Sequence, residues 1–212
     1  MTYTDALIDE LADGATSVRP RTTGKGRAWL TLVAGGTLSL VYATFGFRDD
    51  VMAGQPAPML GITAGLLILL AAAAGAGAVR MSRPQVGAPH SGAPWVLAAL
   101  ALVPAIAAVG VLTSPALSAG LEVHQGMRCL RFGLVSGLGA FAFLTFWLRR
   151  GAPVSPERAS WLAGIAAGAT GALAITLECP QEPLVHLAFW HLGAVPIAAV
   201  AGRLVLPRFL RW

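Results

Sequence analysis

The segment ASWLAGIAAGATGALAITL, residues 159–177, is 19 residues long and contains no Asp, Glu, Lys or Arg. An α-helix rises about 1.5 Å per residue, so a helix of this length nearly crosses the ~30 Å hydrocarbon core of a bilayer. A surface helix of a soluble protein would carry a polar face, which this segment lacks. The sequence therefore predicts a transmembrane helix here.

Similar apolar segments recur along the chain. Together they predict transmembrane helices at residues 28–47, 57–79, 94–112, 129–148, 159–177 and 184–206. The chain of 212 residues is 56% hydrophobic and 12% charged, whereas soluble proteins carry about 25% charged residues. We therefore expect an all-α membrane protein, with a tail at residues 1–27 and a six-span domain at residues 28–212. The acidic start of the tail is unlike the basic start of a signal peptide, so we expect the first span to be retained.

The basic residues predict how the protein lies in the membrane. Twelve of the 15 Lys and Arg residues fall on one side: Arg19, Arg21, Lys25, Arg27, Arg80, Arg83, Arg149, Arg150, Arg158, Arg203, Arg208 and Arg211. The other side has Arg48, Arg128 and Arg131. Short loops rich in Lys and Arg stay in the cytoplasm, so both termini are predicted to be cytoplasmic. The net charge of +5 follows from this asymmetry and requires no nucleic-acid-binding surface.

The predicted spans lack the groups that catalysis or ion transport requires. Arg131 and Arg203 lie near span ends, where their side chains reach the interface. His191, beside Trp190, is interpreted as a packed interfacial residue. No Ser-His-Asp order, zinc-binding helix motif or intramembrane carboxylate pair indicates an enzyme. Three Gly-x-x-x-Gly pairs are interpreted as helix-packing sites within the monomer: Gly61 and Gly65, Gly133 and Gly137, Gly164 and Gly168.

The tail is predicted to begin with a short amphipathic helix. One face is apolar, formed by Tyr3, Leu7, Ile8 and Leu11, and the remaining surface is acidic, formed by Asp5, Asp9, Glu10 and Asp13. Gly14 is expected to end this helix. A helix lying on the membrane surface is the alternative, but such helices favour Lys and Arg on their polar face. We expect the acidic helix to dock on a protein with an apolar groove rimmed by basic residues.

The chain has two cysteines, Cys129 and Cys179, at the outer ends of the fourth and fifth predicted spans. Neighbouring helices pack about 8–10 Å apart, so a modest approach of the side chains would bring the two thiols into bonding range. Three states are open on the oxidising outer side: a structural disulfide, a reversible redox or metal switch, and inert thiols. Because Cys and His together suit zinc, copper and similar ions, both cysteines are also candidate metal ligands. The candidate accessory ligands are His124, Glu178, Glu182 and His186.

Several segments resemble the NrsF-like membrane anti-sigma factors, which are negative regulators of extracytoplasmic-function sigma factors in proteobacteria. The resemblance is carried by CLRFGLVSGLGAF (129–141), LRRGAP (148–153), LAGIAAGATGALAITLECP (162–180), RFLRW (208–212) and, in the tail, DALIDELADGATSVRP (5–20). It implies a six-span protein of the bacterial inner membrane whose tail holds a sigma factor, with no direct contact to nucleic acid.

The same resemblance implies that Cys129 and Cys179 detect a periplasmic redox or metal stress and cause release of the sigma factor. It implies no fixed cofactor, and at most a transient heavy or transition metal ion. A thiol-based membrane oxidoreductase or metal-handling protein is the alternative. That alternative requires an electron carrier or a second thiol pair, and neither is visible in the sequence. A structural membrane protein with a fixed disulfide is a third reading.

Overall fold

The computed structural model describes residues 3–14, 22–83, 122–181 and 183–210, together with single residues between 98 and 112. In these residues the regular secondary structure is helical and includes no strand, which confirms the predicted all-α class. The elements are α1 (Tyr3–Asp13), α2 (Thr23–Phe45), α3 (Asp49–Met52), α4 (Pro58–Met81), α6 (Val123–Arg149), α7 (Pro156–Glu178), α8 (Leu184–His186), the π-helical turn η2 (Leu187–His191), α9 (Ala194–Val205) and α10 (Pro207–Leu210).

Five helical segments among the described residues are long and apolar enough to cross a membrane. They are α2, α4, α6, α7 and the segment Leu184–Val205, which joins α8, η2 and α9. They coincide with five of the six predicted spans, and the predicted span at 94–112 lies mostly outside the described residues. Helix α6 begins at Val123, earlier than predicted, so Cys129 lies inside the helix and not at its start.

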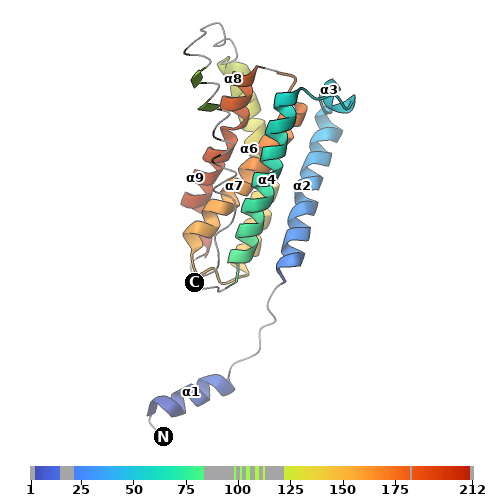
Figure 1. The fold of residues 1–212 in the computed structure, drawn as a ribbon. Coiled ribbons are helices and arrows are strands. Elements are labelled where there is room, and N and C mark those ends of the chain that lie inside the picture. The colour runs from blue at the N-terminus through green and yellow to red at the C-terminus, as the bar shows by residue number, and fades with distance from the viewer. Residues whose placement is uncertain are drawn as a thin grey trace.

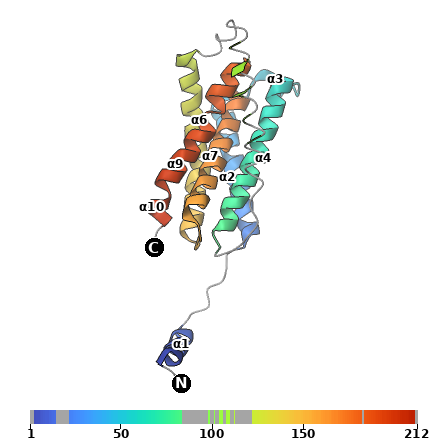
Figure 2. The same cartoon turned by 60° about the vertical axis from the view of Figure 1, so that its left-hand side comes forward.

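Helices α2, α4, α6, α7 and α9 form one elongated bundle, and the start of α2 and α10 lie at the same end of it (Figures 1 and 2). We call this the tail end, and the opposite end, with α3 and α8, the thiol end. Helices α4 and α6 both finish at the tail end, where the amide of Ala152 donates to the carbonyl oxygen of Ser82 at 2.8 Å. The two helices are therefore parallel, and the span at 94–112 stays a prediction. The orientation of the bundle in a membrane stays a prediction.

Helix α7 runs through the middle of the bundle, between α4, α6 and α9 (Figure 1). Its sequence makes this possible, because glycine and alanine let neighbouring backbones approach closely. A Cβ at Gly137 of α6 would lie 2.6 Å from the carbonyl oxygen of Ala167, and one at Gly168 would lie 2.8 Å from that of Ala194. These contacts confirm helix packing within the monomer at two of the three Gly-x-x-x-Gly pairs. A Cβ at Gly61 would have no described atom within 4 Å.

Helix α2 connects the tail to the thiol end and packs loosely along most of its length. All of its residues are described, and Gly26 is the one that is buried. A Cβ at Gly26 would lie 2.6 Å from Trp147 of α6 and 2.6 Å from Val79 of α4, so this first turn fits closely against the bundle. The far end of α2 is held by Arg48, described below. Helix α2 is therefore fixed near its two ends.

Helix α1 forms over the segment that the sequence predicts. It ends at Asp13, and the amide of Gly14 donates to the carbonyl oxygen of Glu10 at 3.1 Å. No residue of α1 is buried, and Tyr3 and Leu11 are 86% and 66% exposed. The apolar face of this helix is therefore uncovered within the described part of the chain.

Candidate functional site

The two cysteines meet at the thiol end of the bundle. Their Sγ atoms lie 3.5 Å apart, both thiols are free, and both side chains are buried. Cys129 projects from the second turn of α6, and Cys179 is the residue that ends α7. Pro180 explains this end, because the residue before a proline is driven out of the helical conformation. Cys179 accordingly has extended backbone angles, with φ −71° and ψ 123°.

Two histidines from the next helical segment complete a cluster with the thiols. His186 ends α8 and His191 ends η2. The Nε2 atom of His186 lies 3.8 Å from the Sγ atom of Cys179, and the two imidazole rings meet edge to face with centroids 5.2 Å apart. One potential ligand atom from each of the four residues lies within 4.8 Å of the others, and all four residues are buried. We call Cys129, Cys179, His186 and His191 the thiol–imidazole cluster.

The π-helical turn brings the two histidines together. Residues five apart in a regular α-helix point about 140° away from each other, because each residue turns the helix by about 100°. In η2 the amide of Leu192 donates instead to the carbonyl oxygen of Leu187 at 3.1 Å, five residues back. This wider turn lets residues five apart share one face, and such turns recur at functional sites. It therefore places His186 and His191 on the same side, toward the thiols.

A hydrogen-bond chain sets the tautomer of the neutral His191 ring. The hydroxyl of Thr176 donates to the carbonyl oxygen of Ala172 at 2.7 Å, so its proton is already used. The Nδ1 atom of His191 lies 3.2 Å from the same hydroxyl oxygen, and Nδ1 must therefore be the donor. In the neutral imidazole the lone pair is therefore on Nε2. This atom is buried and has no hydrogen-bond partner among the described residues.

The cluster is enclosed by apolar and aromatic groups. Trp190 covers the first turns of α6, where the absence of a side chain at Gly126 leaves room for the indole ring. Phe132 packs against the cysteines and meets Phe45 of α2 edge to face, with ring centroids 5.1 Å apart. The pKa of Cys179 is lowered from its usual value, because its hydrogen bonds with Cys129 and His186 favour the thiolate, whereas burial opposes this shift.

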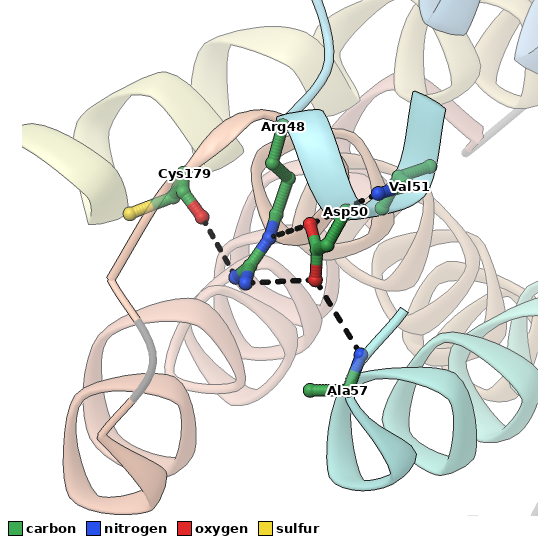
Figure 3. Close-up of polar contacts among 5 residues, drawn as sticks. All are labelled: Arg48, Asp50, Val51, Ala57 and Cys179. Carbon is green, nitrogen blue, oxygen red and sulfur yellow. Dashed lines mark hydrogen bonds and ion pairs between the residues drawn. The ribbon is translucent and has the colours of Figure 1, made fainter. Parts of the chain in front are cut away.

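Arg48 ties the loop after α2 to the chain segment that carries Cys179 (Figure 3). Its Nη1 atom donates to the carbonyl oxygen of Cys179 at 3.1 Å, and its backbone amide donates to the carbonyl oxygen of Leu177 at 3.1 Å. The guanidinium also donates two hydrogen bonds, of 2.7 Å and 3.0 Å, to the Asp50 carboxylate. That contact with Arg48 lowers the pKa of Asp50 from its usual value. We call this set of contacts the Arg48 clamp.

The carboxylate of Asp50 joins the clamp to the start of α4. Its two oxygens also accept hydrogen bonds from the amides of Val51 at 2.9 Å and Ala57 at 3.4 Å. The clamp therefore holds α2, α3, the start of α4 and the end of α7 in one arrangement at the thiol end.

Comparison with known proteins gives the family. The sequence matches the family model for NrsF, described as "Negative regulator of sigma F", over residues 11–212. The chain belongs to the NrsF family. It is similar to a protein of Azospira oryzae named "Probable anti-sigma-F factor NrsF", with 30% identity over 216 residues and 99% of each chain covered. No solved structure matches the chain. Membership of this family of negative regulators confirms the family resemblance found in the sequence.

In this member of the NrsF family, the accessory ligands predicted around the cysteines are only partly brought together. His186 lies in the thiol–imidazole cluster. His124 is exposed on the first turn of α6, and Glu178 is half-buried beside Cys179 without joining the four clustered residues. Glu182 lies outside the described residues.

Two functional candidates were missed in the sequence. His191 was interpreted as a packed residue, yet it stands in the cluster with its side chain 1% exposed. The i, i+5 spacing from His186 is the available signal, but it indicates a shared face only if the helix widens into a π-turn. The sequence indicates Arg48 only as one of the three basic residues on the side predicted to be periplasmic. The Arg-Asp-Asp sequence at 48–50 was the available hint of a local ion pair.

Proposed function

We propose that the protein is a membrane-embedded anti-sigma factor that holds an extracytoplasmic-function sigma factor through α1 and releases it when Cys129 and Cys179 react. The tail end would face the cytoplasm and the thiol end the periplasm, as the distribution of basic residues predicts. The observation that carries the proposal is the buried pair of free thiols, 3.5 Å apart, at the end of the bundle opposite to the tail.

Helix α1 has the properties of a docking segment. It has an uncovered apolar face with Leu7, Ile8 and Leu11 exposed, and it carries Asp5, Asp9 and Glu10 on the rest of its surface. A helix of about 11 residues is marginally stable alone in water, so a partner groove would stabilise it. The negative charge favours a partner with a basic rim, and it disfavours binding to anionic lipid.

The thiol pair is arranged for reversible oxidation. A periplasmic two-electron oxidant would take one electron from each sulfur, both thiol protons would leave, and one S–S bond would form. A disulfide has sulfurs about 2.05 Å apart, so the two atoms must approach by about 1.5 Å. Cys129 lies on α6 and Cys179 ends α7, so this approach displaces the ends of two helices against each other. A thiol-reactive metal ion that binds both sulfurs would act on the same two helix ends.

The Arg48 clamp provides the route from the thiols to the tail. It binds the carbonyl oxygen of Cys179 itself, so a displacement at this residue changes the position of Arg48. Arg48 lies three residues after the end of α2, and α2 is the helix that leads to α1. Coupling over such a distance requires an element with two discrete arrangements. We expect α2, which is loosely packed between its two fixed ends, to be this element.

The proposal is tested by affinity capture with the full-length, detergent-solubilised protein in its reduced state. A sigma factor should be recovered and identified by mass spectrometry. The matched control is the same protein lacking residues 1–14, which should recover none. Recovery of equal amounts by both proteins, or of no sigma factor by either, would exclude the proposed function. The alternative of a thiol oxidoreductase is disfavoured because the chain has two cysteines in total and so no second thiol pair.

A further inference from the structure

We propose that Cys129, Cys179, His186 and His191 are the four ligands of a tetrahedral site for a divalent cation of the zinc and cadmium class. This deepens the proposed sensing role and rests on it for the biological consequence, whereas metal binding itself can be measured without it. The inference begins from the unpartnered, buried Nε2 atom of His191. A buried polar atom without a hydrogen-bond partner costs free energy, and an ion held by the two nearby thiols would give Nε2 a partner.

The distances match those between ligands on one ion. With Zn–S bonds of about 2.3 Å and Zn–N bonds of about 2.0–2.1 Å, tetrahedral geometry sets two sulfurs about 3.7 Å apart and a sulfur and a nitrogen about 3.5 Å apart. The two Sγ atoms are separated by 3.5 Å, and Cys179 Sγ and His186 Nε2 by 3.8 Å. The whole set lies within 4.8 Å, so the widest pair needs to close by about 1–1.5 Å. Side-chain rotation supplies a movement of this size.

The contact of His191 with Thr176 is also the kind that metal-binding histidines make. A metal-binding histidine almost always donates its other ring N–H to a fixed acceptor, which sets its tautomer and orientation. Thr176 does this for His191: its hydroxyl oxygen accepts from Nδ1, while its own proton goes to the carbonyl oxygen of Ala172. With the imidazole neutral, this arrangement leaves the lone pair on Nε2, which is the nitrogen that would bind an ion.

The ligand types select the class of ion. Two thiolates and two neutral imidazoles carry a charge of −2, which a divalent cation neutralises in a buried site. Thiolate and imidazole favour zinc and cadmium, whereas magnesium and calcium require oxygen ligands. Binding would release the two thiol protons to solvent. It would also join α6, the end of α7 and η2 through one ion.

A bound ion and a disulfide exclude each other at this site, because a sulfur in an S–S bond is no longer a thiolate ligand. Metal binding and oxidation would therefore compete for the same two sulfurs. The histidines take part in the first reaction only. Histidine variants can therefore distinguish metal binding from thiol oxidation. A variant that lacks one histidine should lose high-affinity metal binding and keep disulfide formation.

The test uses the full-length protein, reduced, in detergent, with Co²⁺ as the spectroscopic probe and Cd²⁺ as the competitor. One equivalent of Co²⁺ should give the intense d–d bands of tetrahedral coordination and thiolate-to-cobalt charge transfer, and Cd²⁺ should abolish both. His186→Gln and His191→Gln should each weaken binding by at least about tenfold and lose the tetrahedral bands, and Thr176→Val should weaken binding by about 10–100-fold. His124→Gln, an exposed histidine outside the cluster, is the matched control and should bind as the wild type.

Absence of thiolate-to-cobalt bands in the reduced wild type would overturn the site, as would unchanged binding in both histidine variants. Sigma-factor capture is measured on the same preparations, so the two proposals fail separately. Capture by the wild type without metal binding refutes the metal site alone. Metal binding without sigma-factor capture leaves the site standing and refutes the proposed function.

Discussion

The guanidinium of Arg48 donates a hydrogen bond of 3.1 Å to the carbonyl oxygen of Cys179, across 131 positions of the chain. This contact joins the loop after α2 to the residue that ends α7, and the side chain of Arg48 is almost fully buried in making it. Cys179 therefore has two connections: its thiol faces Cys129, and its backbone carbonyl faces the helix that leads to the tail. Chemistry at the thiol and the position of α2 are linked through a single residue.

The first prediction concerns the clamp. Arg48→Lys should still repress but should lose most of its induction by oxidant, because lysine cannot bind the Asp50 carboxylate and the Cys179 carbonyl with one planar fork. Disulfide formation between Cys129 and Cys179, followed by thiol labelling, should be unchanged. The control is Arg131→Lys on the exposed surface of α6. Normal induction in Arg48→Lys would show that the signal reaches the tail by another route.

The docking helix gives the second prediction. Changing Leu7 and Leu11 together to Ala should weaken sigma-factor binding by more than tenfold and switch on the regulated genes without an inducer, because apolar anchors dominate such contacts. Asp13→Asn is the comparison and should have a smaller effect. Binding is measured with the purified protein, and gene activity with a reporter. Full repression by the double variant would rule out this face of α1 as the docking site.

The third prediction separates a switch from a structural role of the thiols. Cys129→Ser and Cys179→Ser should each abolish induction by oxidant and keep basal repression, and the double variant should behave like either single one. Equal effects of this kind mark two residues that act as one unit. Reporter output and the amount of protein in the membrane are measured for all three. A structural disulfide would instead lower the amount of protein and release the sigma factor constitutively.

Helix packing gives the fourth prediction. Gly137→Ala should destabilise the bundle by about 1–3 kcal/mol, because the new Cβ would meet the backbone of α7, which cannot move aside as a side chain can. Gly61→Ala is the matched control, since no described atom lies within 4 Å of its Cβ position. Thermal unfolding of the two detergent-solubilised variants checks this difference. Equal stability would mean that α6 and α7 pack less closely than the structure describes.

The bundle could be predicted from the sequence because a segment that crosses a membrane must satisfy its backbone hydrogen bonds internally. A span of about 20 apolar residues has few alternatives to a helix, so α7 follows from its composition alone. The proximity of Cys129 and Cys179 followed as well, since both fall at the same end of helices joined by a short loop. These features depend on segment length and chain order, and both can be read from the sequence.

The position of His191 and the role of Arg48 depend on geometry that the sequence does not encode in a repeating pattern. With 3.6 residues per turn, His191 would face away from His186, and the π-turn that corrects this has no recognised sequence signature. Arg48 acts on a backbone carbonyl at Cys179, and carbonyls are present at every residue. The sequence at 48–50 hints at the ion pair with Asp50, but it gives no indication of the contact with Cys179.

The proposed release of a sigma factor by oxidation of the thiol pair is tested most directly on the captured complex. The complex is immobilised through the full-length protein, oxidised, and divided for two measurements: the fraction of protein with a Cys129–Cys179 disulfide, and the fraction of sigma factor still bound. The account predicts that bound sigma factor falls in proportion as the disulfide forms and is regained after reduction. Sigma factor that stays bound while the disulfide forms completely would contradict it.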